Sequence, residues 1–190
     1  ERLESVTVSP KNPLYCSIDG VVYDIDQTSV VVYPLGKADL HQVPDSVTDV
    51  SAIFEYLSYY PNLNLQLGNG VTDYVTVDGV IYSADMKTLY YCSPSKTGTY
   101  VMPDSVTEIA SCGFANTGLT EITVSPNVTE IVYGVFMGSK TLQKVNLPDN
   151  LQSIGLYAFQ YCTGLKSADI PASLTAIDSL AYDGCTGLEA

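Results

Sequence analysis

The chain has 190 residues, 46% of them hydrophobic, which is enough apolar material for one or two folded domains. Twenty-one acidic residues against eight basic ones give a net charge of −13, and this charge disfavours nucleic acids and anionic membrane surfaces as partners. No apolar run approaches the roughly 18 residues of a membrane-spanning helix, so we expect no membrane insertion in this segment.

Residues 1–99 repeat at an interval of 59 residues. The segment DGVVY at 19–23 returns as DGVIY at 78–82, and Lys37 returns as Lys96. In each copy an Asp-Gly turn signal and alternating apolar residues lead through a second turn into another strand, at 30–33 or 89–92. We therefore expect two super-units, each with a β-hairpin inserted between successive coils. Residues 54–74 fit this scheme least well, and the sequence assigns them no register.

Residues 100–190 follow a shorter period of 23 residues. The sequence CTGL at 162–165 recurs at 185–188, and Pro148 has its equivalent in Pro171. Each unit contains an apolar alternation that runs into a proline, which ends the strand. An aromatic residue at position 114, 136, 159 or 182 then fills the widest part of the coil. A unit this short cannot bury its own apolar face, so stacked units must share one core.

Four motifs occur in the sequence, and variants of them extend over nearly the whole chain: Leu-x-x-Val-x-Leu-Pro, Val-Thr-x-Ile, Ala-Phe-x-x-Cys and Ser-Ile-Asp-Gly-Val-x-Tyr. They resemble the BspA-type leucine-rich repeats of bacterial cell-surface proteins. The resemblance implies an α/β, strand-rich fold in which residues 1–190 form a single right-handed leucine-rich-repeat solenoid. A parallel sheet would line one face, with short turns or helical pieces opposite. It also implies an extracellular location, on the bacterial surface or secreted, and a protein-binding or adhesive role.

Solenoids need polar capping units over their terminal coils, and neither end of this sequence carries one. Two interpretations follow. The chain is a fragment of a longer repeat protein, or copies of it associate end to end.

The residues that could carry chemistry all have structural explanations. His41 is the only histidine, and the 59-residue period places Tyr100 at its equivalent, which favours a structural histidine over a catalytic one. Asp24 and Asp26 form an Asp-x-Asp pattern that could hold a hard cation, but the second copy begins with Ser83, and a hairpin turn explains both copies. We therefore expect no enzyme, no metal and no cofactor.

Five cysteines are an odd number without a CxxC pair, which indicates neither a zinc site nor a complete disulfide framework. Cys162 and Cys185 occupy equivalent places in adjacent coils, about 4.8 Å apart if stacked as strands. That distance permits a disulfide, whereas the parallel direction of side chains in a ladder favours buried free thiols.

The outward positions of the strands are the strongest candidates for a binding site. They should form adjacent rungs of one sheet face and are Glu121, Thr123, Lys144, Asn146, Ser167 and Asp169. The alternative is a solvated polar face, as on any sheet exposed to water. A rival surface is formed by hairpin tyrosines, which could instead cover the edge of the coil: Tyr23, Tyr33, Tyr82 and Tyr90.

The sequence therefore predicts a non-enzymatic extracellular recognition or adhesion module. Its partner would be a protein or glycan on a host or neighbouring cell, bound through the sheet face or the hairpins. The alternative is a structural spacer or stalk within a larger bacterial surface protein.

Overall fold

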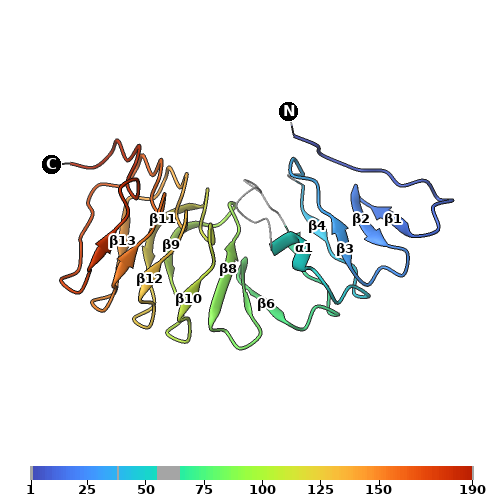
Figure 1. Cartoon of the computed structure of the whole chain (residues 1–190), viewed down its shortest axis with the longest axis horizontal. Coiled ribbons are helices and arrows are strands. Elements are labelled where there is room, and N and C mark those ends of the chain that lie inside the picture. Colours follow the sequence, from blue (N-terminus) through green and yellow to red (C-terminus); the bar gives the residue numbers. More distant parts are fainter. Residues whose placement is uncertain (1, 38, 55–64, 190) are drawn as a thin grey trace. The chain divides into compact units, whose positions relative to one another are not determined.

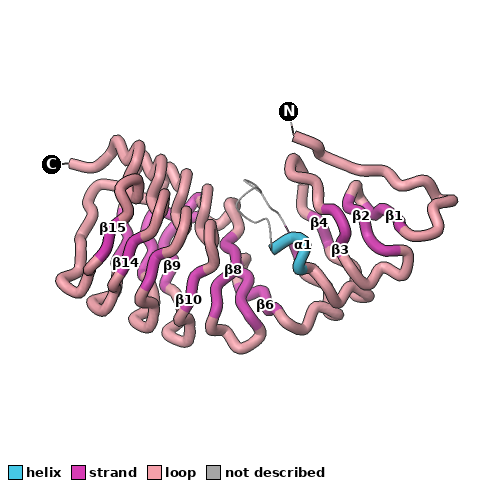
Figure 2. Tube along the Cα trace, viewed as in Figure 1, coloured by secondary structure: helices cyan, strands magenta, loops and turns pink. Residues whose placement is uncertain are grey.

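The computed structural model describes residues 2–37, 39–54 and 65–189. The chain divides into two compact units, Glu1–Thr76 and Val77–Ala190. The regular elements of both units are mostly short strands joined by loops and turns, and the described residues contain one helix of four residues, α1 (Ser51–Phe54) (Figures 1 and 2). Among these residues, no helix has the length and apolarity needed to cross a membrane.

A hairpin sheet forms the first part of unit 1. Its antiparallel strands are β1 (Tyr15–Ile18), β2 (Val21–Asp24) and β3 (Val30–Val32). The predicted Asp-Gly turn joins β1 to β2, with Asp19 and Gly20 at φ values of 48° and 81°. Two left-handed residues match the twist of the flanking strands, which is why this dipeptide favours a tight hairpin. The inserted hairpin is thus confirmed.

The turn after β2 explains the Asp-x-Asp pattern. The Oδ1 atom of Asp24 accepts hydrogen bonds of 2.7 Å from the backbone N–H groups of Thr28 and Ser29. In the second copy, the hydroxyl of Ser83 accepts from the N–H of Thr88 at 2.9 Å. Both side chains cap the same turn, as the hairpin interpretation predicts.

The remainder of unit 1 contains two very short strands and the helix. β4 (His41–Gln42) pairs in parallel with β5 (Leu65–Gln66), and Phe54 at the end of α1 stacks on Tyr74 at 4.5 Å. Within the region that lacked a predicted register, residues 55–64 lie outside the described part of the chain. β6 (Tyr74–Val77) spans the boundary between the units.

Unit 2 begins with the second hairpin and continues into the regular coils. β7 (Val80–Ser83) pairs antiparallel with β8 (Thr88–Cys92), and β8 pairs in parallel with β10 (Glu108–Ile109). A parallel sheet in the order β9–β11–β13 follows, as labelled in Figure 1. Its strands are β9 (Thr97–Val101), β11 (Gly118–Thr123) and β13 (Lys144–Asn146).

A second parallel sheet lies in the part of each coil where only turns or helical pieces were expected. It consists of β12 (Glu130–Ile131), β14 (Ser153–Ile154) and β15 (Ala176–Ile177), paired in that order. The strands of both sheets recur at the spacing of the sequence repeat. The strand-rich solenoid with parallel sheets and inserted hairpins is therefore confirmed, with less helix than the resemblance implies.

The repeat aromatics form one continuous stack through the core of unit 2. Phe114, Phe136 and Phe159 are at most 1% exposed, and the stacked neighbouring rings from Phe114 to Tyr182 lie 4.7 to 5.6 Å apart. Each ring therefore fills its own coil and contacts the ring of the next coil, as the period predicts.

The cysteine position of the repeat has a defined hydrogen-bonding role. The thiols of Cys162 and Cys185 donate to the backbone carbonyls of Phe136 and Phe159 in the preceding coil, at 3.0 and 2.9 Å. In the coil where serine replaces cysteine, the Ser139 hydroxyl donates to Phe114 at 2.8 Å. All five cysteines are free thiols, and these two tie adjacent coils together as donors.

Candidate functional site

The parallel sheet of unit 2 brings four of the six predicted site residues onto one face. In the register of β11 and β13, Glu121 lies opposite Lys144 and Thr123 lies opposite Asn146. Between them, Ile122 and Val145 are only 0% and 7% exposed and point into the core. The alternation of a strand thus separates a buried apolar row from an outward polar row.

These four side chains form a connected polar network. The Asn146 amide donates to Oε1 of Glu121 at 2.9 Å and to the hydroxyl of Thr123 at 3.1 Å. The ammonium of Lys144 lies 3.5 Å from the same Glu121 oxygen. The hydrogen bond from Asn146, followed by the charge of Lys144, lowers the pKa of Glu121 below its ordinary value. The face therefore carries a paired charge and fixed amide and hydroxyl groups.

Ser167 and Asp169 do not form the third rung of this face. Both are exposed, and they lie in an irregular segment in which Ile170 is 44% exposed. Ala168 occupies the place of Ile122 and Val145, and its single methyl group buries too little apolar surface to hold a strand against the core. The prediction of a strand here is wrong for this reason.

The register adds two residues to the face that the sequence argument missed. On β9, Thr99 lies opposite Glu121 and Val101 lies opposite Thr123. Val101 is 70% exposed, the largest exposure among the large hydrophobic residues of the described chain. The spacing to the proline gave no usable signal, because it aligns Val101 before Pro103 with the buried Val124 before Pro126, whereas the strand register places Val101 opposite Thr123. We define the sheet face as these six residues: Thr99, Val101, Glu121, Thr123, Lys144 and Asn146.

A hollow of about 580 Å³ adjoins the sheet face at the ends of β11 and β13. Thr123 and Asn146 form part of its lining, together with apolar groups of Val124 and Leu147 and the repeat prolines 126 and 148. A surface with an apolar hollow beside fixed polar groups can accept an apolar side chain of a partner and hydrogen-bond the groups around it.

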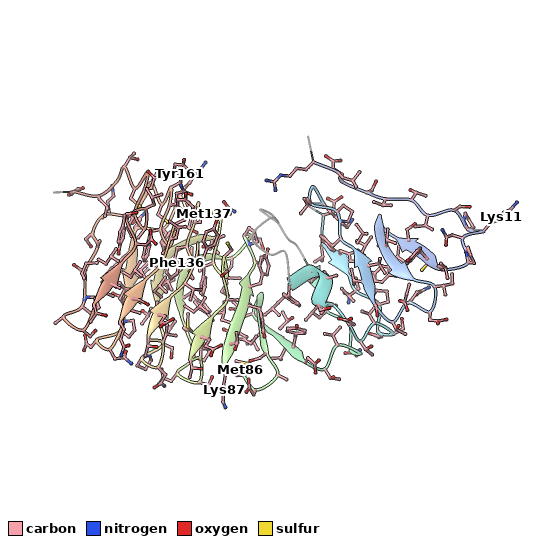
Figure 3. The ribbon with its side chains drawn as sticks, viewed as in Figure 1. Lys11, Met86, Lys87, Phe136, Met137 and Tyr161 are labelled. Atoms are coloured by element: carbon pink, nitrogen blue, oxygen red, sulfur yellow. The ribbon has the colours of Figure 1, made fainter. Side chains whose placement is uncertain are left out.

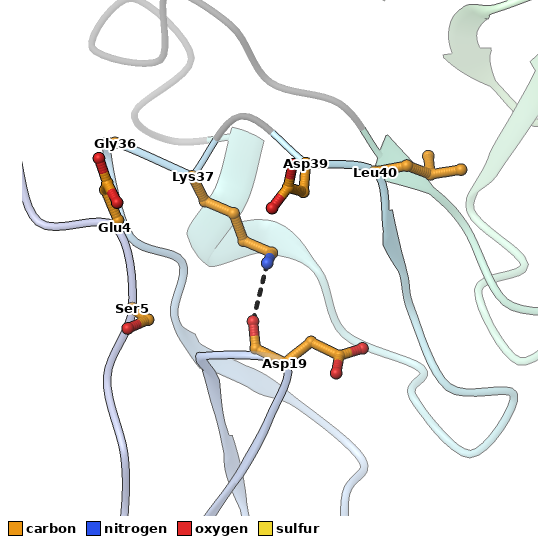
Figure 4. Close-up of a pocket in the computed structure, with 7 residues that line it drawn as sticks. All are labelled: Glu4, Ser5, Asp19, Gly36, Lys37, Asp39 and Leu40. Carbon is orange, nitrogen blue, oxygen red and sulfur yellow. Dashed lines mark hydrogen bonds between the residues drawn. The ribbon is translucent and has the colours of Figure 1, made fainter.

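A second hollow, of about 590 Å³, lies in unit 1 (Figure 4). It is lined by Glu4, Ser5, Asp19, Gly36, Lys37, Asp39 and Leu40. The Lys37 ammonium donates to the backbone carbonyl of Asp19 at 2.8 Å, so it holds the hairpin turn. No group of three or more His, Cys, Asp or Glu side chains within the described chain could bind a metal ion.

The hairpin tyrosines do not provide the rival binding surface. Tyr23, Tyr33 and Tyr82 are 0%, 4% and 2% exposed, because consecutive residues of β2 and β7 are buried on both faces of the hairpin. Tyr90 is partly exposed on β8. The alternative that the tyrosines cover the coil is the one that the structure supports.

His41 has the structural role that its tyrosine equivalent suggested. Its ring is fully buried, and its Nε2 atom is hydrogen-bonded to the hydroxyl of Tyr23. At the same positions of the second copy, the hydroxyls of Tyr82 and Tyr100 bond to each other. Burial, followed by the charge of Lys37, lowers the pKa of His41.

Comparison with known proteins agrees with this architecture. The family model of the BspA type leucine rich repeat region matches residues 84–190 in six copies. The crystal structure of the pneumococcal vaccine antigen PcpA is similar with a TM-score of 0.67 at 20% identity, over 86% of this chain and 40% of that one. This likeness shows the fold alone.

Two further solved structures are also similar. A leucine rich cell surface protein from Faecalibacterium prausnitzii has a TM-score of 0.65 at 25% identity, over 81% of this chain and 41% of that one. A leucine-rich repeat protein from Bacteroides capillosus has a TM-score of 0.55 at 25% identity, over 62% of this chain and 96% of that one. The chain thus spans about two fifths of the pneumococcal and Faecalibacterium proteins. A comparison with curated protein sequences finds no match.

Proposed function

Because this chain belongs to the family of BspA-type leucine-rich repeat proteins of bacterial surfaces, we propose that it is a non-enzymatic, extracellular recognition module. Its partner is a protein on a host or neighbouring cell, bound through the sheet face of unit 2. Solenoids commonly use the regular surface of their stacked strands in this way.

The observation that carries this proposal is the combination of an exposed apolar residue with a fixed polar network. Val101 projects from the same row of the sheet as Thr123 and Asn146, and both of these residues also border the 580 Å³ hollow. Protein interfaces join an apolar centre to a polar rim in the same manner. The Glu121–Lys144 pair leaves the centre of the face with little net charge, in contrast to the acidic chain as a whole.

The non-enzymatic part of the proposal is supported by the state of the one histidine. His41 is buried and bonded to Tyr23, so its ring nitrogens do not face a substrate. The cell-surface location is supported by the family and by the similar proteins named above.

The structural spacer is the second candidate, and one observation favours it. The aromatic stack from Phe114 to Tyr182 runs through four successive coils of unit 2, and close packing of this kind resists bending. A rigid element of this kind could hold another domain away from the cell wall.

A binding screen with one variant and one control separates the two candidates. The purified chain is tested against extracellular matrix proteins and epithelial surface proteins, beside Val101→Arg, which places a bulky charge on the sheet face. Val32→Arg is the matched control, because Val32 is a strand residue of unit 1 with 42% exposure. A partner that binds the parent and the control but not Val101→Arg supports recognition by the sheet face. Absence of any partner favours the spacer, and equal binding to all three chains rejects the sheet face as the site.

A further inference from the structure

The hollow beside the sheet face has polar groups at the ends of two strands and in one of the turns that follow. Thr123 and Asn146 line it at the ends of β11 and β13, and Asp149 and Asn150 line it from the turn after β13. Both turn residues are exposed. The rest of the lining is the apolar part described above, so these few polar groups decide which side chain of a partner fits.

Asn146 lines the hollow with an unused acceptor and no free donor. Its amide nitrogen donates to Oε1 of Glu121 and to the hydroxyl of Thr123, and these two bonds use both hydrogens of the amide group. Within the described chain, no group donates a hydrogen bond to its carbonyl oxygen, Oδ1. A partner group that bonds to Asn146 must therefore be a hydrogen-bond donor.

Asp149 adds a negative charge that no cation of the described residues neutralises. The ion pairs among these residues all use other carboxylates: Lys87 with Asp85, Lys96 with Asp78 and Lys144 with Glu121. Figure 3 shows Lys87 projecting from the turn of the second hairpin, where Asp85 also lies. The hollow thus combines an apolar lining, a carboxylate without a counter-ion and an amide oxygen without a donor.

We propose that this hollow receives an arginine side chain of the partner protein. The proposal rests on the recognition function of the sheet face and names the residue that the partner contributes to it. The aliphatic part of the arginine packs on Leu147 and the repeat prolines. Its guanidinium group donates to the carboxylate of Asp149 and to Oδ1 of Asn146.

The other classes of side chain match these groups less well. An entirely apolar side chain would cover the Asp149 carboxylate without giving it a partner, which costs free energy. An acidic side chain would be repelled by the same carboxylate. Lysine is a compact and strongly hydrated point charge, whereas arginine has five N–H donors in a planar fork and is more weakly hydrated. Arginine therefore suits two separate acceptors beside an apolar surface.

The charge of the molecule favours the same kind of partner. The net charge of −13 attracts a basic segment and speeds its association, more strongly at low salt. On the sheet face itself, the Glu121–Lys144 pair leaves little net charge. Asp149 therefore sets the sign of the charge at this end of the face.

The repeat shows that the fold does not require the carboxylate. The residue after the repeat proline is Asp149 in this coil, Asn127 in the preceding coil and Ala172 in the following one. All three lie in exposed or partly exposed turns of the same kind. Asp149→Asn installs the residue of the preceding coil, so we expect it to leave the melting temperature unchanged.

A short peptide tests the site without the partner protein. The probes are acetyl-Gly-Arg-Gly-amide and its lysine and citrulline forms, titrated into the isotope-labelled chain while NMR follows the backbone amides. Citrulline has the shape of arginine without its charge. We expect the arginine peptide to shift the amide signals of Asn146 and Asp149 with a dissociation constant of about 1 mM. The lysine peptide should bind at least about threefold more weakly, and citrulline should not bind measurably.

A matched pair of variants separates this site from general attraction to an acidic chain. Asp149→Asn should weaken the arginine peptide at least about fivefold. Asp104→Asn removes the same charge from the equivalent turn two coils earlier, outside the hollow, and should bind like the parent. The proposal is overturned if the arginine peptide leaves the amides around the hollow unshifted or if the citrulline peptide binds as well. It is also overturned if the two variants weaken binding equally.

Failure of this site and failure of the recognition function have different results. A protein partner that is lost with Val101→Arg but bound equally well by Asp149→Asn would support recognition by the sheet face and overturn the arginine site. Binding of the arginine peptide at the hollow, with no protein partner found in the screen, would support the site and count against the recognition function.

Discussion

The two hairpin super-units meet the same packing requirement with different residues. In unit 1 the buried hydroxyl of Tyr23 bonds to the imidazole of His41, and in unit 2 the hydroxyl of Tyr82 bonds to that of Tyr100. Each pair lies at the same places in a 59-residue period. The place of His41 and Tyr100 therefore requires a side chain that can hydrogen-bond the hairpin tyrosine, and more than one residue type meets this requirement. Only the histidine copy adds a group that titrates near neutral pH.

The largest expected effect comes from removing the hairpin tyrosine itself. Tyr23→Ala and Tyr82→Ala should each lower the free energy of unfolding of their own unit by about 3–5 kcal/mol, because each deletes a buried aromatic ring. Urea denaturation measures the loss, and hydrogen exchange with mass spectrometry assigns it to residues 2–76 or 77–189. A loss below about 1 kcal/mol in either unit would show that the two copies are not energetically equivalent.

Acidification should separate the two copies, because the first copy has the titratable imidazole of His41 where the second has Tyr100. The pKa of this imidazole is lowered below the ordinary value of 6.5, chiefly by burial and then by Lys37, and Asp19 opposes this shift. Tyr23 and Tyr33 also face the ring. A lowered pKa means that the unfolded chain binds the proton more readily than the folded one. The contribution of neutral His41 to the free energy of unfolding is therefore fully present above pH 6.5. It declines as the pH falls from 6.5 towards the lower pKa of the folded state.

The measurement is the free energy of unfolding of unit 1 between pH 7.5 and pH 5. One proton gives a slope of at most about 1.4 kcal/mol per pH unit. His41→Tyr installs the residue of the second copy, and we expect it to remove this slope while unit 2 serves as an internal control. If the slope persists in His41→Tyr, another group causes it. The exchange of histidine for tyrosine between the two copies would then have no effect on the pH dependence of stability.

A smaller difference should appear at the lysines that hold the two hairpin turns. Lys37 donates to the carbonyl of Asp19 at 2.8 Å, and Lys96 donates to that of Asp78 at 2.7 Å. Lys96 also contacts the Asp78 carboxylate at 2.5 Å and lies 5.5 Å from the ring centre of Tyr100. Lys96→Met should therefore cost about 1–2 kcal/mol and Lys37→Met about 0.5–1 kcal/mol. Thermal unfolding of the two variants tests this order, and an equal or reversed cost would contradict it.

Much of this architecture can be predicted from the sequence, because the repeat periods show which side chains take equivalent places in one core. The 23-residue spacing places the stacked aromatics, and strand alternation places Glu121 opposite Lys144 on the outward face. Periodicity predicts a strand wrongly at Ala168, where the side chain offers too little apolar surface. It also does not predict whether the Tyr23 side chain is buried or exposed, because both faces of that strand are covered and alternation no longer distinguishes them.

Other features leave no signal in a single sequence. Strands of two residues, such as β12 and β14, are too short to show a period of two. The left-handed backbone at Tyr157 and Tyr161 arises from the stacking of successive turns, and nothing in the composition of those turns distinguishes tyrosine from glycine at that place.

The smallest expected effect is at the cysteine position of the repeat. It tests whether this position, like that of His41 and Tyr100, requires a hydrogen-bonding group and not one residue type. Ser139 and Cys162 both donate to the aromatic residue's carbonyl in the preceding coil. Burial, followed by the nearby Cys185, raises the pKa of Cys162 to about 12, so the thiol keeps the proton that it donates. If the position requires a donor and not a sulfur atom, Cys162→Ser should change the free energy of unfolding by less than about 0.5 kcal/mol.

Cys162→Ala is the matched comparison, since it removes the donor and leaves a smaller side chain in a fully buried place. We expect it to cost about 1–2 kcal/mol in the same denaturation experiment, more than the serine variant. Equal costs for serine and alanine would mean that sulfur volume governs this position. Equivalent places in successive coils would then be matched by shape here and by hydrogen bonding only in the hairpins.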